Sequence, residues 1–260
     1  MPLALKPADL IMIVVVTAQV LTVAYIHAPR AKSMIYMLPL PFSTGLVSTG
    51  HGIDTTHMLG MAVVWGFLWL IWLLHTRLRV PIILADLCGI AVYGMAGFAL
   101  AKVVPAHSGL ASPWYWTAAS ILLVLSLLAL RLRHPQEPGH RSAMPLPLKG
   151  ALVVLVILVL IGVRSSLRGF MPTFPLATIF TVYEARHSLR TLAQRIPIFI
   201  AGFTFMATVI AWLLPVQTPI APVDYVLPLL CGWAVFIPVY LGLDFWYARQ
   251  HASPRLGHTQ

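Results

Sequence analysis

Of the 260 residues of this chain, 59% are hydrophobic and only 9% are charged, and the mean hydropathy is +0.87. Soluble domains carry about 25% charged residues, so the composition excludes an ordinary water-soluble fold and predicts a surface that faces lipid. The formal net charge of +10 does not indicate nucleic-acid binding, because the basic residues lie in short loops between apolar runs and not on one face of a folded domain.

Apolar runs bounded by prolines, glycines and charged residues predict about nine transmembrane helices, because a helix needs about 20 residues to cross a bilayer. In chain order these segments are 10–27, 33–50, 57–75, 81–103, 113–130, 150–163, 169–184, 191–213 and 222–246. The sixth segment is short, and its flanks Pro147, Lys149 and Arg164 favour one helix over a re-entrant loop. The predicted fold class is therefore an all-α polytopic membrane protein whose main partner is the lipid bilayer.

The distribution of Lys and Arg predicts an orientation in the membrane. When successive loops are assigned to alternate sides, 13 of the 17 Lys and Arg residues fall on one side, and the other side receives Lys6, Lys102, Arg164 and Arg168. Cytoplasmic loops are enriched in basic residues, so this bias predicts an N-terminus outside and a C-terminus in the cytoplasm.

Two parts of the chain resemble each other when one is shifted along the other. A shift of 134 aligns Pro41 with Pro175, and a shift of 143 aligns residues 87–89 with 230–232, both Leu-Cys-Gly. Five crossings separate the copies, so the second copy would be inverted, as is common in transporters. Chance similarity between apolar segments is the alternative. The predicted 4+1+4 arrangement has a first repeat over 1–104, a linking helix over 105–131, a cytoplasmic linker over 132–149, and an inverted repeat with a short tail over 150–260.

The second copy carries the motif Gly169-Phe-Met-Pro-Thr-Phe-Pro175, followed by Tyr183 and a basic run. With this motif, residues 150–245 resemble the GlpM-like family of small bacterial inner-membrane proteins of about four spans, some of which insert in both orientations. The resemblance implies a bacterial inner (cytoplasmic) membrane location and a fused, fixed-orientation version of a dual-topology dimer. It implies an architecture and no defined activity. The first copy departs from the motif, since Leu38 stands where the second has Pro172.

Segments 33–50 and 169–184 both combine prolines with hydroxyl side chains. Each proline removes a backbone donor and frees a carbonyl of the preceding turn, which in lipid needs another partner. Interrupted helices at corresponding places in two repeats indicate a transport site near the midplane. The alternative is a pair of kinks whose hydroxyls bond to their own helices. The candidate substrate-binding residues are Pro41, Ser43, Thr44, Ser48, Pro172, Pro175, Thr178 and Thr181.

His51, Asp54 and His57 follow one another at i,i+3 spacing, so on a helix they would share a face and could bind a metal, with Met58 and Met61 nearby for a soft ion. Capping of the following helix is the alternative for these side chains.

Ionisable residues within or at the ends of the spans are costly and are therefore functional candidates. Asp86 and Glu184 are candidates for coupling ion movement to solute movement. The alternative is a structural ion pair, which is the favoured interpretation for Asp244 and Arg195.

The leading hypothesis is a small-solute transporter or permease with a midplane site between the second and seventh segments. Two alternatives are a non-catalytic accessory subunit in envelope biogenesis and a metal- or haem-handling membrane protein that also uses His27 or His107. The sequence contains no P-loop, nucleophile elbow, HExxH motif or Rossmann fingerprint. The solute or ion, any cofactor, and the choice between monomer and homodimer stay open.

Overall fold

The structure is a computed structural model that describes residues 5–105, 109–132, 145–184, 186, 189–214 and 220–251, with all side chains in these ranges except those of 29, 163–166, 168, 176–178 and 251. Every regular element within these residues is a helix. The elements are α1 (Pro7–Tyr25), α2 (Pro29–Tyr36), α3 (Leu40–Thr49), α4 (Thr55–Trp72), η1 (Leu73–Arg77), α5 (Ile82–Val103), α6 (Pro113–Ala129), α7 (Leu146–Leu167), η2 (Arg168–Phe170), α8 (Leu176–Glu184), α9 (Leu189–Leu213), η3 (Pro222–Tyr225) and α10 (Val226–His251).

The chain is an all-α protein embedded in a membrane. Among the described residues, the helical stretches that are long and apolar enough to cross a bilayer are Pro7–Tyr25, Thr55–Arg77, Ile82–Val103, Leu189–Leu213 and Pro222–Gln250. Two shorter apolar helices cover Pro113–Ala129 and Leu146–Gly162. Large apolar side chains such as Val103, Trp212 and Leu227 are exposed on these helices, and we expect them to contact lipid.

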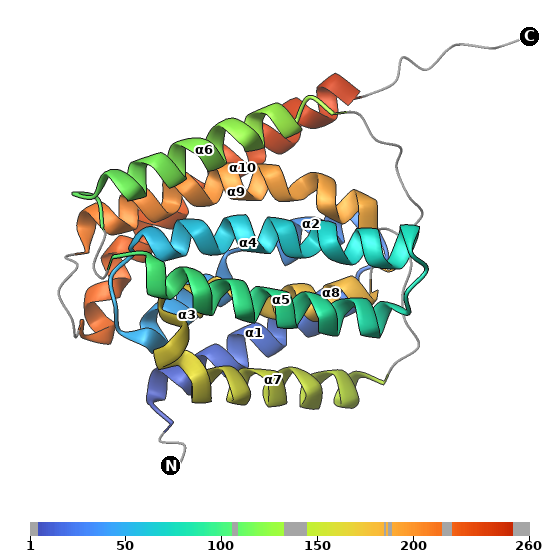
Figure 1. Cartoon of the computed structure of the whole chain (residues 1–260), viewed down its shortest axis with the longest axis horizontal. Coiled ribbons are helices and arrows are strands. Elements are labelled where there is room, and N and C mark those ends of the chain that lie inside the picture. Colours follow the sequence, from blue (N-terminus) through green and yellow to red (C-terminus); the bar gives the residue numbers. More distant parts are fainter. Residues whose placement is uncertain are drawn as a thin grey trace, which may run out of the picture.

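The helices run along the long axis of the molecule and form one bundle (Figure 1). In this view α6 and α10 lie along one edge and α7 along the opposite edge, with α9, α4 and α5 between them. The main neighbours are α4 with α5 and α9 with α10, and α6 packs against both α4 and α9. Helix α1 begins at one end of the bundle, and α10 ends at the other (Figure 1).

Each of the nine predicted segments is helical over most of its length, but two of them are interrupted. Segment 33–50 is divided between α2 and α3, and segment 169–184 is divided between η2 and α8. The sixth segment is longer than predicted, because α7 already begins at Leu146 and includes Lys149. Pro147 is tolerated there, since the first turn of a helix has no backbone donor to lose.

Candidate functional site

The first interruption lies between α2 and α3 and is held by a side chain of α1. The Gln19 amide donates hydrogen bonds to the backbone carbonyls of Ile35 (2.9 Å), Tyr36 (3.2 Å) and Leu38 (3.1 Å). Gln19 is only 4% exposed. A buried polar side chain of α1 therefore donates hydrogen bonds to the backbone carbonyls at the break between α2 and α3.

Replacing Gln19 with leucine should lower the free energy of unfolding by about 1–1.5 kcal/mol, the net contribution of a hydrogen bond. The loss should be partial, because the Ile35 and Leu38 carbonyls also accept backbone N–H groups. Thermal unfolding in a fixed detergent would measure it. Thr22→Ala is the matched control, since the exposed Thr22 hydroxyl donates to the Ala18 carbonyl of its own helix. Equal stability of the two variants would contradict the role given to Gln19.

The second interruption lies between η2 and α8 and is held by α5. The Tyr93 hydroxyl donates to the Phe170 carbonyl (2.9 Å) and lies 3.0 Å from the Thr173 hydroxyl, which also bonds to the Gly169 carbonyl (3.1 Å). Tyr93 is fully buried. Each interruption is thus supported by a buried polar side chain from a neighbouring helix.

The two interruptions meet at one cavity of about 50 Å³. Residues 36–39, 41 and 42 line it from the first interruption and residues 172–175 from the second. The remaining wall comes from Met61 and Val64 of α4 and from Ile196 and Phe199 of α9. Three of the candidate residues, Pro41, Pro172 and Pro175, therefore lie together, although they are far apart in the sequence. We call this space the proline cavity.

Four of the five candidate hydroxyls belong to described side chains, and none of these four lines the proline cavity. Ser43 donates to the Pro39 carbonyl (2.8 Å) and accepts from the Trp233 indole N–H (3.0 Å). Thr44 bonds to the carbonyl of Leu40 in its own helix (2.8 Å). Ser48 donates to the Asp9 carboxylate, which is fully buried at the start of α1. These hydroxyls face backbone or α1 and α10, as the kink alternative expects for Ser43 and Thr44. The Thr178 side chain lies outside the described part of the structure.

A second and larger cavity of about 260 Å³ lies between α1, α5, α7 and α8, and we call it the carboxylate cavity. Three candidate residues, Asp86, Thr181 and Glu184, line it together with Lys149. The Lys149 ammonium lies 2.5 Å from the Glu184 carboxylate, and both side chains are buried. Asp86 Oδ1 and the Thr181 hydroxyl are buried and have no hydrogen-bond partner among the described residues. The sequence did not predict the role of Lys149, because its position before the sixth segment suggested a solvated linker.

Two of the three proposed metal ligands lie at the start of α4 and make the capping contacts that were the alternative for them. Asp54 is the N-cap of α4 and accepts a hydrogen bond from the Thr56 backbone N–H (2.9 Å), while His57 Nδ1 lies 3.0 Å from the Asp54 carboxylate. His51 is exposed, and its carbonyl accepts from the Tyr225 hydroxyl (3.1 Å). No group of three metal-binding side chains is found in the described ranges. His107 lies outside those ranges.

Asp244 and Arg195 form the expected ion pair, and Arg30 joins it. The Asp244 carboxylate in α10 binds the guanidinium of Arg195 in α9 and, at 2.8 Å, that of Arg30 in α2. Asp244 and Arg195 are buried, whereas 58% of the Arg30 side chain is exposed. This prediction of a structural ion pair is confirmed.

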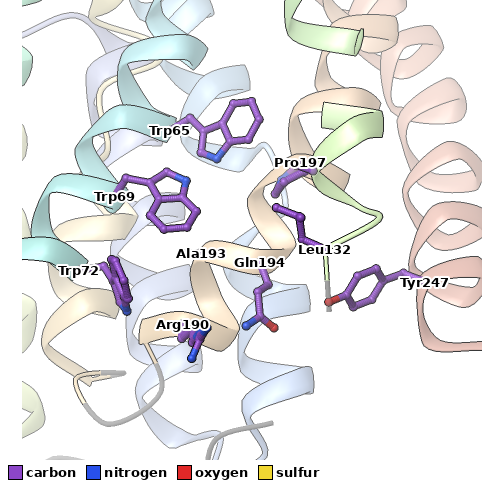
Figure 2. A pocket seen from close by; sticks show the side chains of 10 residues that line it. Trp65, Trp69, Trp72, Leu132, Arg190, Ala193, Gln194, Pro197 and Tyr247 are labelled. Carbon is purple, nitrogen blue, oxygen red and sulfur yellow. The ribbon is translucent and has the colours of Figure 1, made fainter. Parts of the chain in front are cut away.

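A third, small cavity of about 30 Å³ lies where α4, α9 and α10 meet. Figure 2 shows three tryptophans of α4 on one side and Gln194 and Arg190 of α9 opposite them. The Trp65 indole nitrogen and the Gln194 amide nitrogen are buried there without an acceptor among the described residues. The space suits one small acceptor such as a water molecule, and it is too small for an organic solute.

Comparison with protein-family models, with curated proteins and with solved structures finds no match for this chain.

Proposed function

We propose that the chain is a small-solute permease of the bacterial inner membrane whose translocation route passes through the proline cavity. The observation that carries this proposal is the meeting of the two interrupted helices at one cavity. Interrupted helices expose backbone groups that can bind a solute, and such backbone is tolerated at membrane depth only where it is buried or lines a cavity.

The proposal includes nine crossings in two inverted repeats. The shift of 143 relates Gly89 to Gly232 and Phe67 to Ile210. A Cβ added at Gly89 would lie 2.7 Å from Phe67, and a Cβ added at Gly232 would lie 2.7 Å from Ile210. The same close contact is therefore present in both copies. The shift of 143 also relates the buried positions of α5 to the buried positions of η3 and α10. The pairs in which both residues are buried are Ile82 and Tyr225, Ala85 and Pro228, Gly89 and Gly232, Tyr93 and Phe236, and Gly97 and Tyr240.

The same shift relates the helices that wall the proline cavity. Helix α4 supplies one wall and α9, its counterpart in the second repeat, supplies the other. The two ends of the described chain lie at opposite ends of the bundle, as an odd number of crossings requires (Figure 1). With the excess of basic residues on the cytoplasmic side, this arrangement gives an external N-terminus. It also agrees with the fused GlpM-like architecture.

The size of the proline cavity restricts the mechanism. A volume of about 50 Å³ holds only a few water-sized groups, so the structure corresponds to a closed state of the proposed permease. Transport would require movement of one repeat against the other around the interruptions, which widens the cavity toward one side at a time. The buried donors Gln19 and Tyr93 would keep the interruptions intact during this movement.

Cysteine labelling tests this proposal without knowledge of the solute. In a Cys88→Ala, Cys231→Ala background, Leu38→Cys would put a thiol on the wall of the proline cavity. Alternating access requires that a membrane-impermeant thiol reagent react with it from both sides of oriented vesicles. Leu127→Cys, on the exposed apolar face of α6, is the matched control and should not react, because a thiol facing lipid stays protonated. Lack of reaction at position 38 from both sides would favour the accessory-subunit alternative.

A further inference from the structure

We propose that the carboxylate cavity binds a lipophilic monocation, an amphiphile with one ammonium group and an apolar body of about a dozen non-hydrogen atoms. This inference goes beyond the permease proposal, because it concerns a different cavity and requires no transport.

The charge of the cavity wall selects the sign of the ligand. The charged side chains that line it are Asp86, Glu184 and Lys149, and the ammonium of Lys149 is bound to Glu184. The Asp86 carboxylate therefore remains without a counter-ion among the described residues. A buried carboxylate without a cation is costly, and a ligand ammonium would supply both the opposite charge and a hydrogen-bond donor. An anionic headgroup would instead meet this unpaired carboxylate.

Two polar groups of the cavity wall suit an ammonium in particular. Asp86 is 92% buried and Thr181 is 99% buried. Within the described ranges, neither Oδ1 of Asp86 nor the Thr181 hydroxyl has a hydrogen-bond partner. Both side chains line the same cavity, Asp86 from α5 and Thr181 from α8. An ammonium has three N–H donors, so one ammonium has enough donors for both the carboxylate and the hydroxyl oxygen.

The rest of the wall suits an apolar body. Val20 and Val23 of α1, Ile90 of α5 and Val156 of α7 contribute only hydrocarbon to it. A dry protein cavity of about 150 Å³ accommodates benzene. The volume of about 260 Å³ therefore accepts an aromatic ring with a short alkyl chain.

The wall also indicates how such a ligand enters. Ile83 and Leu87 line the cavity, yet they are 60% and 56% exposed on the outer face of α5. The cavity therefore reaches the lipid-facing surface of the bundle. An amphiphile dissolved in the membrane can enter from the side, without passing through the proline cavity.

The test compares ligands that share one skeleton and differ in the head group. The full-length protein in phosphatidylcholine nanodiscs is titrated with 4-phenylbutylamine, 4-phenyl-1-butanol and 4-phenylbutyrate, with empty nanodiscs subtracted. We expect the amine to bind at least tenfold more tightly than the alcohol and the butyrate to bind most weakly. In Asp86→Asn the affinity for the amine should fall to within threefold of that for the alcohol. Asp224→Asn, which changes an exposed acidic residue, should leave the tenfold preference unchanged.

Several outcomes would overturn the inference. Equal affinity for the amine and the alcohol, tightest binding of the butyrate, or an amine preference that survives in Asp86→Asn would each do so. Absence of saturable binding of all three ligands would overturn it as well. If Asp86→Asn does not fold, the affinities of the natural protein for the three ligands still test the preference for the amine. Val156→Trp, which fills the cavity, should then abolish saturable binding of the amine. A failure here leaves the permease proposal intact, because the labelling at position 38 probes another cavity.

Discussion

Replacing Asp244 with alanine is expected to lower the free energy of unfolding by about 3–5 kcal/mol, the cost of breaking a buried ion pair from one side. The carboxylate binds both Arg195 and Arg30, and Arg195 is almost fully buried between α9 and α10. Without Asp244 the Arg195 guanidinium would keep its charge in an apolar interior. Unfolding by sodium dodecyl sulfate from mixed micelles would measure this loss.

Two further variants separate the contributions of the ion pair. Asp224→Ala changes an exposed acidic residue and should alter stability by no more than about 0.5 kcal/mol. The double variant Arg195→Met, Asp244→Leu removes both buried charges and should recover most of the stability lost in Asp244→Ala, because an apolar pair has no desolvation penalty. If Asp244→Ala costs no more than Asp224→Ala, the ion pair contributes nothing to the fold.

The sequence predicted the helical segments well, because hydrophobic length is a local property. The edges of α5 and α9 fall within two residues of the predicted segments 81–103 and 191–213. The start of α7 was missed, since Pro147 and Lys149 look like the end of a polar linker. Only the partner of Lys149, which is Glu184 in α8, explains why a lysine is buried at that place.

The candidate site was predicted in part, because some of its features are local in the sequence and others depend on how the helices pack. A proline inside a helix removes one backbone donor, so the interruptions near Pro41 and Pro175 could be suspected from the sequence. Proline alone does not decide, because α9 and α10 continue through Pro197 and Pro238. The direction of a hydroxyl depends on helix rotation, which the sequence did not determine. Thr181 consequently lines the carboxylate cavity, while Ser48 faces Asp9. Gln19 and Tyr93 were not selected at all, although a lone glutamine within an apolar helix was a usable signal.

Replacing Gly60 with valine is expected to lower the free energy of unfolding by about 3 kcal/mol, at the upper end of the usual cost of overpacking. Gly60 lies in α4 where the second interruption crosses it. A Cβ at this position would overlap the Thr173 hydroxyl and lie 2.9 Å from the Thr173 Cβ. Thr173 cannot move freely, because its hydroxyl contacts Tyr93 and bonds to the Gly169 carbonyl. The added side chain would therefore displace the wall of the proline cavity or separate α4 from it.

Gly66 of the same helix supplies the matched control, since a Cβ there would meet nothing within 4 Å and the residue is exposed. Gly66→Val should change stability by no more than about 0.5 kcal/mol, as exposed substitutions usually do. Thermal unfolding of both variants in one detergent separates a steric effect from a change in helix propensity, because the two substitutions are chemically identical. If Gly60→Val is as stable as Gly66→Val, α4 does not approach the second interruption as closely as the structure has it. If only Gly60→Val loses stability, and if labelling of Leu38→Cys is reduced in the Gly60→Val background, the close contact of α4 with Thr173 is needed for the shape of the proline cavity.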